Sequence, residues 1–288
     1  MSSHSSKGSP VTDPLAFFSS TADGFVAERF AISRWSPDMI NGAALCGLVA
    51  RALENDHSGD GFVPARLTVD LFKPARTAPI TTRTTLVRDG NRIRVADAEL
   101  LQDGEVVVRA GAVFLRPSEQ PPGEVWTRDY RPSPPPVHIP MQAGDVTHPY
   151  FGSDDHPEGW SQSMLEHQGS SRKRMWAQHL PVVAGEEPSP FARAAMAGEP
   201  TSLMTNWGTA GVGFINVDMT LVLARLPEGV EVGIEADDHI SSDGLAVGTT
   251  TMYDRRGPIG TCVVSALANA RRQVDFSGQG VFELPENA

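Results

Sequence analysis

Two stretches of the chain share one pattern of apolar and polar positions. Residues 62–74 and 214–227 both alternate in polarity, and their alignment matches Thr68 with Thr220. Alternation with a period of two is typical of a half-buried strand, and a pattern that recurs along a chain indicates a duplicated supersecondary unit. The sequence therefore predicts two copies of one antiparallel β unit.

The turns between the predicted strands recur as well. Glycine-containing dipeptides stand at matching places in the two copies: Asp89-Gly90 with Asp243-Gly244, and Asp103-Gly104 with Arg256-Gly257. Asp-Gly between alternating stretches is a strong hairpin signal, because its backbone accepts positive φ. The strands that close the copies, residues 106–115 and 260–268, are apolar at most positions. We therefore expect them in the centre of a sheet rather than at a wet edge.

A helix is predicted ahead of the first β unit, over residues 41–54. Its apolar side chains recur on one face: Leu45, Leu48, Val49, Ala52 and Leu53. Asn41 or Asp38 is the candidate cap at its start, and residues 55–59 end it. The small residues in its first turns would let a sheet approach closely.

The second copy has the same order of elements. Residues 172–180 are predicted to form a strand, and a helix follows from Ser189-Pro190, where a capping serine precedes a proline suited to the first turn. Pro200 must kink or end this helix just after Glu199. Each copy is thus predicted to combine a helix with several antiparallel strands.

Composition divides the chain into five parts. We expect a disordered terminus over residues 1–13, a first unit over 14–116, a proline-rich linker over 117–158, a second unit over 159–272 and a C-terminal tail over 273–288. The linker is the clearest of these, since eight prolines fall within residues 117–140.

Charge and cysteine content narrow the class of protein. The 288 residues carry a net charge of -11, which argues against nucleic acid or an anionic membrane as the main partner. The two cysteines, Cys46 and Cys262, are too few for a disulfide framework and are expected to be buried thiols. With no apolar run of membrane-spanning length and no apolar stretch resembling a secretory signal, we expect a cytoplasmic protein.

A helix followed by strands that can wrap around it is the hot-dog arrangement. In residues 41–54, 66–74, 214–221 and 253–257 the chain resembles the type II acyl-CoA thioesterases and the wider thioesterase-like group. The resemblance covers roughly residues 20–116 and 160–272. It implies an α+β double hot dog, with two tandem antiparallel sheets each wrapped around a central helix. It also implies hydrolysis of acyl-CoA thioesters by water, with no covalent intermediate and no cofactor.

The same resemblance implies a catalytic site in the second copy. In that family an aspartate on the second helix, a threonine at the start of the next strand and a glutamine on the last strand orient and activate the water. These positions fall on Glu199, Asn216 and Ser265. All three are polar, and none keeps the family's residue. A non-catalytic acyl or acyl-CoA binding protein is therefore the alternative, and a hydratase acting on enoyl thioesters ranks last.

Each candidate also has a structural interpretation. Glu199 could be a solvated charge at a helix kink, and Asn216 and Ser265 could be buried polar groups satisfied by their neighbours. Strand alternation places Asp218 on the same face as Asn216, where it would contact substrate or supply the acid, although a charge at the sheet rim is the simpler interpretation.

Coenzyme A carries phosphates, so a basic surface is needed as well. Arg172, Lys173 and Arg174 are the candidates, with solvated charges at a strand end as the alternative. No metal site is predicted, because Asp154-Asp155-His156 lacks a second histidine at ligand spacing and Glu166-His167 is no stronger. Since a fused pair of units leaves exposed sheet edges, we expect a homodimer or higher homo-oligomer.

Overall fold

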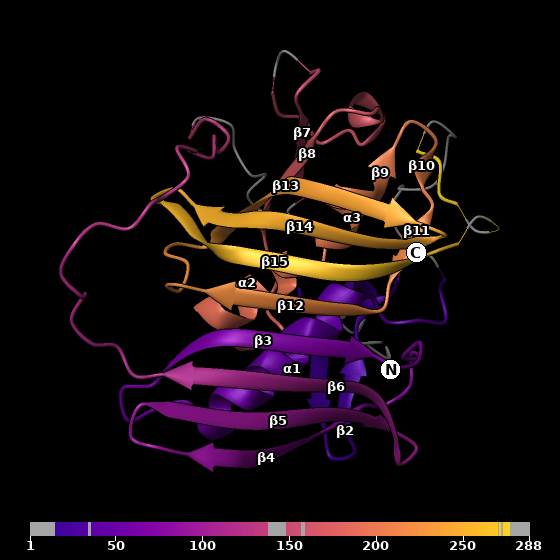
Figure 1. Cartoon of the computed structure of the whole chain (residues 1–288). Coiled ribbons are helices and arrows are strands. Elements are labelled where there is room, and N and C mark those ends of the chain that lie inside the picture. Colours follow the sequence, from indigo (N-terminus) through magenta and orange to yellow (C-terminus); the bar gives the residue numbers. More distant parts are fainter. Residues whose placement is uncertain are drawn as a thin grey trace, which may run out of the picture.

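The structure is a computed structural model that describes residues 15–33, 36–137, 148–156, 159–269, 271 and 273–276. Its main feature is one continuous sheet of eleven strands, with the helices on one side of it (Figure 1). The strand order is β4-β5-β6-β3-β12-β15-β14-β13-β8-β7, and β11 pairs with β15 beside this path. Every pairing within the sheet is antiparallel.

The first half of the sheet surrounds one long helix. Its strands are β3 (Val63–Leu71), β4 (Thr81–Asp89), β5 (Ile93–Gln102) and β6 (Glu105–Leu115), and they pack on α1 (Gly42–His57). Asn41 caps α1 as predicted, since its Oδ1 accepts from the Ala44 N–H at 2.8 Å. A small hairpin of β1 (Phe18–Thr21) and β2 (Gly24–Ala27) and the short helix η1 (Arg29–Ala31) precede α1.

The second half has a shorter, broken helix. Ser189 caps α2 (Pro190–Gly198) by accepting from the Ala192 N–H at 3.0 Å, and α3 (Thr201–Asn206) begins beyond Pro200, as the sequence predicts. The strands are β7 (Tyr150–Ser153), β8 (Lys173–Gln178), β11 (Phe214–Asn216), β12 (Asp218–Leu223), β13 (Glu231–Ser242), β14 (Leu245–Asp254) and β15 (Gly257–Ala268). The short helix η2 (Leu165–His167) lies between β7 and β8, and β9 (Trp207–Gly208) pairs with β10 (Gly211–Val212) outside the main sheet.

The two halves are arranged with mirrored strand order about β3 and β12. The order β4-β5-β6-β3 is followed by β12-β15-β14-β13, so each of these strands has a counterpart in the other half. At the junction Thr68 is the register partner of Thr220, and their hydroxyls lie 3.0 Å apart. The two residues that the sequence alignment matches therefore meet each other. The prediction of two tandem sheets is corrected here, because backbone pairing across β3 and β12 joins them into one.

Two of the four predicted turns, Asp103-Gly104 and Asp243-Gly244, and the predicted central strands are confirmed. Asp103 and Gly104, and likewise Asp243 and Gly244, have positive φ, as two-residue hairpin turns require. β6 lies between β5 and β3, and β15 lies between β12 and β14. Alternate residues of these strands are buried against the helices, which places the core between the sheet and α1, α2 and α3.

Parts of the predicted linker and tail pair with the second half of the chain. β7 falls inside the range 117–158 and pairs with β8. At the other end Val274 exchanges backbone hydrogen bonds with Val212 at 2.8 and 3.0 Å. The predicted disordered terminus, residues 1–13, lies outside the described residues. In the part of the chain that the structure describes, no helix has the length and apolar character needed to cross a membrane.

Candidate active site

Glu199 stands at the junction between the two halves. It directly follows α2 and is partly buried, and its carboxylate lies against the first residue of α1. A Cβ atom built on Gly42 would lie 2.3 Å from Glu199 Oε1, so only glycine leaves room for this approach. Burial raises the pKa of Glu199, and a hydrogen bond from Asn216 opposes that rise. Within the described residues no basic side chain forms an ion pair with Glu199.

The N-terminus of α1 supplies donors beside this carboxylate. Asn41 satisfies the Ala44 N–H through its side chain and the Leu45 N–H through its carbonyl. Among the described residues no hydrogen bond is formed by the N–H groups of Gly42 and Ala43. The first turn of a helix carries partial positive charge, so these two groups can stabilise an anion or a developing oxyanion. Sequence reasoning placed the site in the second copy and missed this contribution from the first.

Asn216 is brought to Glu199, whereas Asp218 is turned away. Asn216 Nδ2 donates to Glu199 Oε1 at 3.4 Å. Asn216 pairs with Ala266 and Thr220 with Val263, so β11 and β12 use one residue more than β15 over this interval. This bulge reverses the alternation of side chains. The expectation that Asp218 shares the face of Asn216 is therefore wrong.

Ser265 belongs with Asp218 on the face of the sheet opposite the helices. Its Oγ donates to Asp218 Oδ2 at 3.0 Å, and its backbone N–H donates to Asp218 Oδ1 at 2.6 Å. The neighbours of Ser265 on β15, Val264 and Ala266, are the residues buried on the helix side. The structure thus brings together Glu199 and Asn216 but leaves Ser265 and Asp218 as a separate pair.

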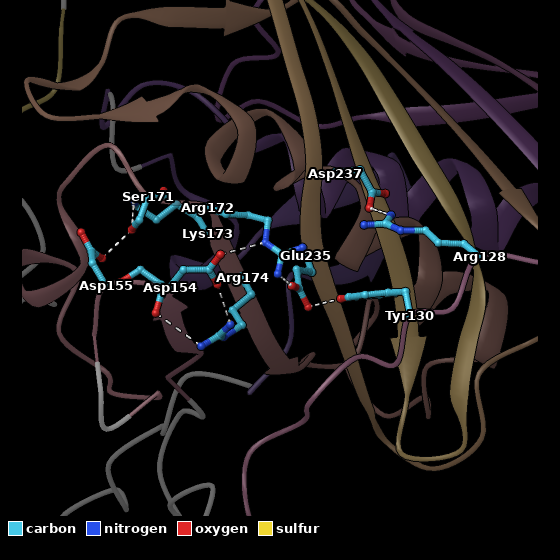
Figure 2. A network of polar contacts seen from close by, with 11 residues as sticks. Arg128, Tyr130, Asp154, Asp155, Ser171, Arg172, Lys173, Arg174, Glu235 and Asp237 are labelled. Carbon is cyan, nitrogen blue, oxygen red and sulfur yellow. Dashed lines mark hydrogen bonds and ion pairs between the residues drawn. The ribbon is translucent and has the colours of Figure 1, made fainter.

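The three basic candidates already have internal partners (Figure 2). Arg172 lies 2.7 Å from the buried Glu235 and 3.3 Å from Asp154, and Arg174 pairs with Asp154 at 3.2 Å. Lys173 is 1% exposed and donates to the carbonyl oxygens of its own loop. Because these charges are compensated in place, none of the three is available to a coenzyme A phosphate without breaking a bond.

The same network holds the proline-rich segment against the sheet. Tyr130 donates its hydroxyl to Glu235, and Arg128 pairs with Asp237 at 2.7 Å, both acceptors being on β13 (Figure 2). Further along, the carbonyl of Pro135 accepts from Arg255 at 2.9 Å. The stretch from Arg128 to Pro135 therefore lies on the second half of the sheet.

Both cysteines are buried near the helix junction, as predicted. Cys262 Sγ contacts the Gly198 carbonyl at 3.4 Å, one residue before Glu199. Burial raises the pKa of Cys262 to about 12, and it raises that of Cys46 as well, with Glu199 adding to the effect in both. Thiols held protonated in this way are weak nucleophiles. Both thiols lie near Glu199 and are not candidate nucleophiles.

Family models match both halves of the chain. The acyl-CoA thioesterase N-terminal domain matches residues 31–115, and the acyl-CoA thioesterase C-terminal domain matches residues 122–267. These matches cover most of the 288 residues, so the chain belongs to the acyl-CoA thioesterase family. No match was found among curated protein sequences.

Solved structures agree on the fold. The tesB protein of Mycobacterium avium subspecies paratuberculosis is 14% identical with a TM-score of 0.59, over 87% of this chain and 95% of that chain. Acyl-CoA thioesterase II TesB2 from Mycobacterium marinum is 14% identical with a TM-score of 0.57, over 79% and 88%. A hot-dog protein from Alicyclobacillus acidocaldarius is 17% identical with a TM-score of 0.55, over 82% and 89%. At such identities the likeness establishes the hot-dog fold alone.

Proposed function

We propose that this protein hydrolyses acyl-CoA thioesters, with Glu199 activating a water molecule as the nucleophile. The observation that carries the proposal is the meeting of a partly buried carboxylate with the N-terminus of α1. There the N–H groups of Gly42 and Ala43 have no hydrogen-bond partner among the residues that the structure describes. A base and an oxyanion site side by side are what acyl transfer to water needs. Family membership makes a thioester the fitting substrate.

The reaction would use each group once. Glu199 takes a proton from water as the water oxygen bonds to the thioester carbonyl carbon, and the N–H groups of Gly42 and Ala43 bind the oxyanion that forms. Collapse of this tetrahedral intermediate breaks the carbon–sulfur bond, and the Glu199 carboxyl returns the proton to the departing thiolate. Asn216 keeps the carboxylate oriented through its amide. No bond forms between protein and acyl group.

The test is thiol release from short-, medium- and long-chain acyl-CoAs. We expect Glu199→Gln to reduce kcat by about 10² to 10⁴, the usual contribution of a general base. Asn216→Ala should have a smaller effect, since it only orients the carboxylate. Glu54→Gln is the matched control, because Glu54 is also a partly buried glutamate with a raised pKa but bonds to Ser189 away from the site. No turnover by the unaltered protein on any chain length would end the proposal.

A binding protein without turnover is the second candidate. It is favoured by the replacement of the family's aspartate, threonine and glutamine at the matched positions, and by the separation of Ser265 from Glu199. Calorimetry with a non-hydrolysable acyl-CoA analogue distinguishes the two. Binding by the unaltered protein, together with no thiol release from the matching acyl-CoA, would favour this candidate. Activity that Glu199→Gln abolishes would reject it.

We also propose that the two halves are two hot-dog units fused in one chain, with the acyl chain held between helix and sheet. The mirrored strand order about β3 and β12 supports the first point. Assembly into a homo-oligomer and a cytoplasmic location stay predictions. The sheet ends in β4 and β7, which provide the two edges at which further pairing would occur.

A further inference from the structure

A second group of polar side chains lies away from the proposed active site, in the segment between β7 and β8. His156 follows the end of β7, and Glu166 and His167 lie in η2. The fold of this segment is fixed by Phe151 and Ser161, which exchange backbone hydrogen bonds at 2.7 and 2.9 Å. Ten residues lie between the two histidines in the sequence, which is why no ligand spacing is visible along the chain.

The three side chains converge on one point. A single ligand atom from each of His156, Glu166 and His167 lies within 4.8 Å of the other two. His156 Nε2 is 3.5 Å from Glu166 Oε2, and the two imidazole rings have centroids 4.7 Å apart. Ligands of a tetrahedral zinc ion lie about 3.4 Å from one another, so closure needs a shift of roughly 1 Å. Glu166 Oε2 already has about this spacing from His156 Nε2, so the shift must bring this pair closer to His167.

His167 is oriented as a metal-binding histidine needs to be. It is 1% exposed, and Ser153 Oγ lies 2.9 Å from its Nδ1. When Nδ1–H donates to this buried hydroxyl, the lone pair is on Nε2, where Ser161 Oγ lies 3.0 Å away. Such an outer partner fixes tautomer and ring orientation in metal sites. The Ser161 hydroxyl can rotate aside when an ion takes the lone pair.

His156 has an unsatisfied nitrogen in the same place. Its Nδ1 is buried and has no hydrogen-bond partner among the described residues, while its Nε2 faces the carboxylate. Nε2 is therefore the nitrogen of His156 that can bind an ion together with Glu166.

Two cations lie close by, and both are compensated. Arg174 pairs with Asp154 at 3.2 Å, and Lys173 donates to the carbonyls of Gly169 and Ser171. Asp155, which accepts a hydrogen bond from the Ser171 hydroxyl, adds negative charge beside Lys173. The local charge is therefore balanced before Glu166 contributes its own.

We propose that His156, Glu166 and His167 bind one divalent cation of the zinc class, with water in the fourth position. Two imidazole nitrogens and one carboxylate oxygen are donors that zinc accepts in proteins. The exposed side of Glu166 gives the ion a path from solvent. The bound ion would tie η2 to the loop after β7 and so brace the start of the second half of the sheet.

The test is metal binding by the full chain after chelation and desalting. We expect one equivalent of Co²⁺ to give the visible absorption of a four-coordinate site, and Zn²⁺ to displace it and raise Tm. His156→Ala and Glu166→Gln should each weaken Zn²⁺ binding by at least about tenfold, as ligand-shell changes do. Glu166→Gln is the conservative variant, since Glu166 is half exposed and its replacement leaves the fold intact.

His239→Ala is the matched control, because His239 is an exposed histidine on β13 outside the cluster. It should bind cobalt and zinc like the unaltered protein. Absence of the cobalt spectrum, or equal zinc affinity in the unaltered and His156→Ala proteins, would overturn the proposal. The proposal is independent of the proposed activity, so Glu199→Gln should still bind the metal.

Discussion

Glu199, the proposed general base, is a partly buried carboxylate, and its burial costs stability when it is charged. Its carboxylate lies against Gly42 and accepts one long hydrogen bond from Asn216. The end of the helix at Glu199 was readable from the sequence, because a proline inside a helix kinks or breaks it. The orientation of Asp218 was not, since it depends on one extra residue in β11 and β12 relative to β15, and that is a property of strand pairing.

The raised pKa of Glu199 has consequences of known sign. The folded protein holds the proton more tightly than the unfolded chain does, so folding is favoured at low pH and this contribution is lost as the pH rises through the raised pKa. Glu199→Gln should therefore raise Tm at pH 7, by about 2–4 °C for each kcal/mol gained. The gain should shrink when the pH is lowered toward 4. A scan of Tm against pH for both proteins checks this.

The proposed activity should increase with pH, opposite to the stability contribution of Glu199, because a general base works in its deprotonated form. We expect kcat/KM to fall as the pH drops through a midpoint above the ordinary range of a glutamate. A pH profile of thiol release measures that midpoint. An acidic limb centred on the ordinary glutamate pKa would show that another group controls the rate.

At the scale of elements, local sequence signals predicted most of the helix starts and hairpin turns. Asn41 and Ser189 cap the two helices, and the Asp-Gly pairs at 103 and 243 turn the hairpins. These are contacts between residues close in sequence, so their chemistry is visible in the sequence. β7 was not predicted, because it is only four residues long and is stabilised by pairing with β8 rather than by a local sequence signal.

Gly233 lies within a strand rather than a turn, and close packing leaves no room for a side chain there. It lies in β13, where an added Cβ would approach ring atoms of Tyr253 and Trp176 to 2.5 and 2.6 Å. Gly233→Ala should therefore lower the free energy of unfolding by about 1–3 kcal/mol through overpacking. Urea denaturation measures this. Gly208→Ala is the control, since nothing lies within 4 Å of its added Cβ, and a similar loss in both would indicate a general intolerance of alanine.

At the scale of the molecule, the linker joins distant parts of the chain. Tyr130 reaches Glu235, which is also held by Arg172 and is 3% exposed. The proline content predicted an extended segment but not its docking, because the partners lie on β13, about a hundred positions later.

Removing the Tyr130 hydroxyl tests how much the contact between the linker and β13 contributes to the free energy of unfolding. Tyr130→Phe should lower the free energy of unfolding by about 1 kcal/mol, because the buried Glu235 loses a donor while Arg172 remains. Guanidinium denaturation gives the value. If the double variant Arg128→Ala with Tyr130→Phe unfolds at the same denaturant concentration as the unaltered protein, the linker adds nothing to stability.

Thr68 and Thr220 meet where the two halves join, each opposite its own counterpart. Two separate chains related in this way would have to find each other, and their joining would weaken on dilution. Here both halves belong to one polypeptide, so each always encounters its partner at a fixed effective concentration. The junction between β3 and β12 is therefore as complete in a dilute solution as in a concentrated one, and its stability is a property of the single molecule.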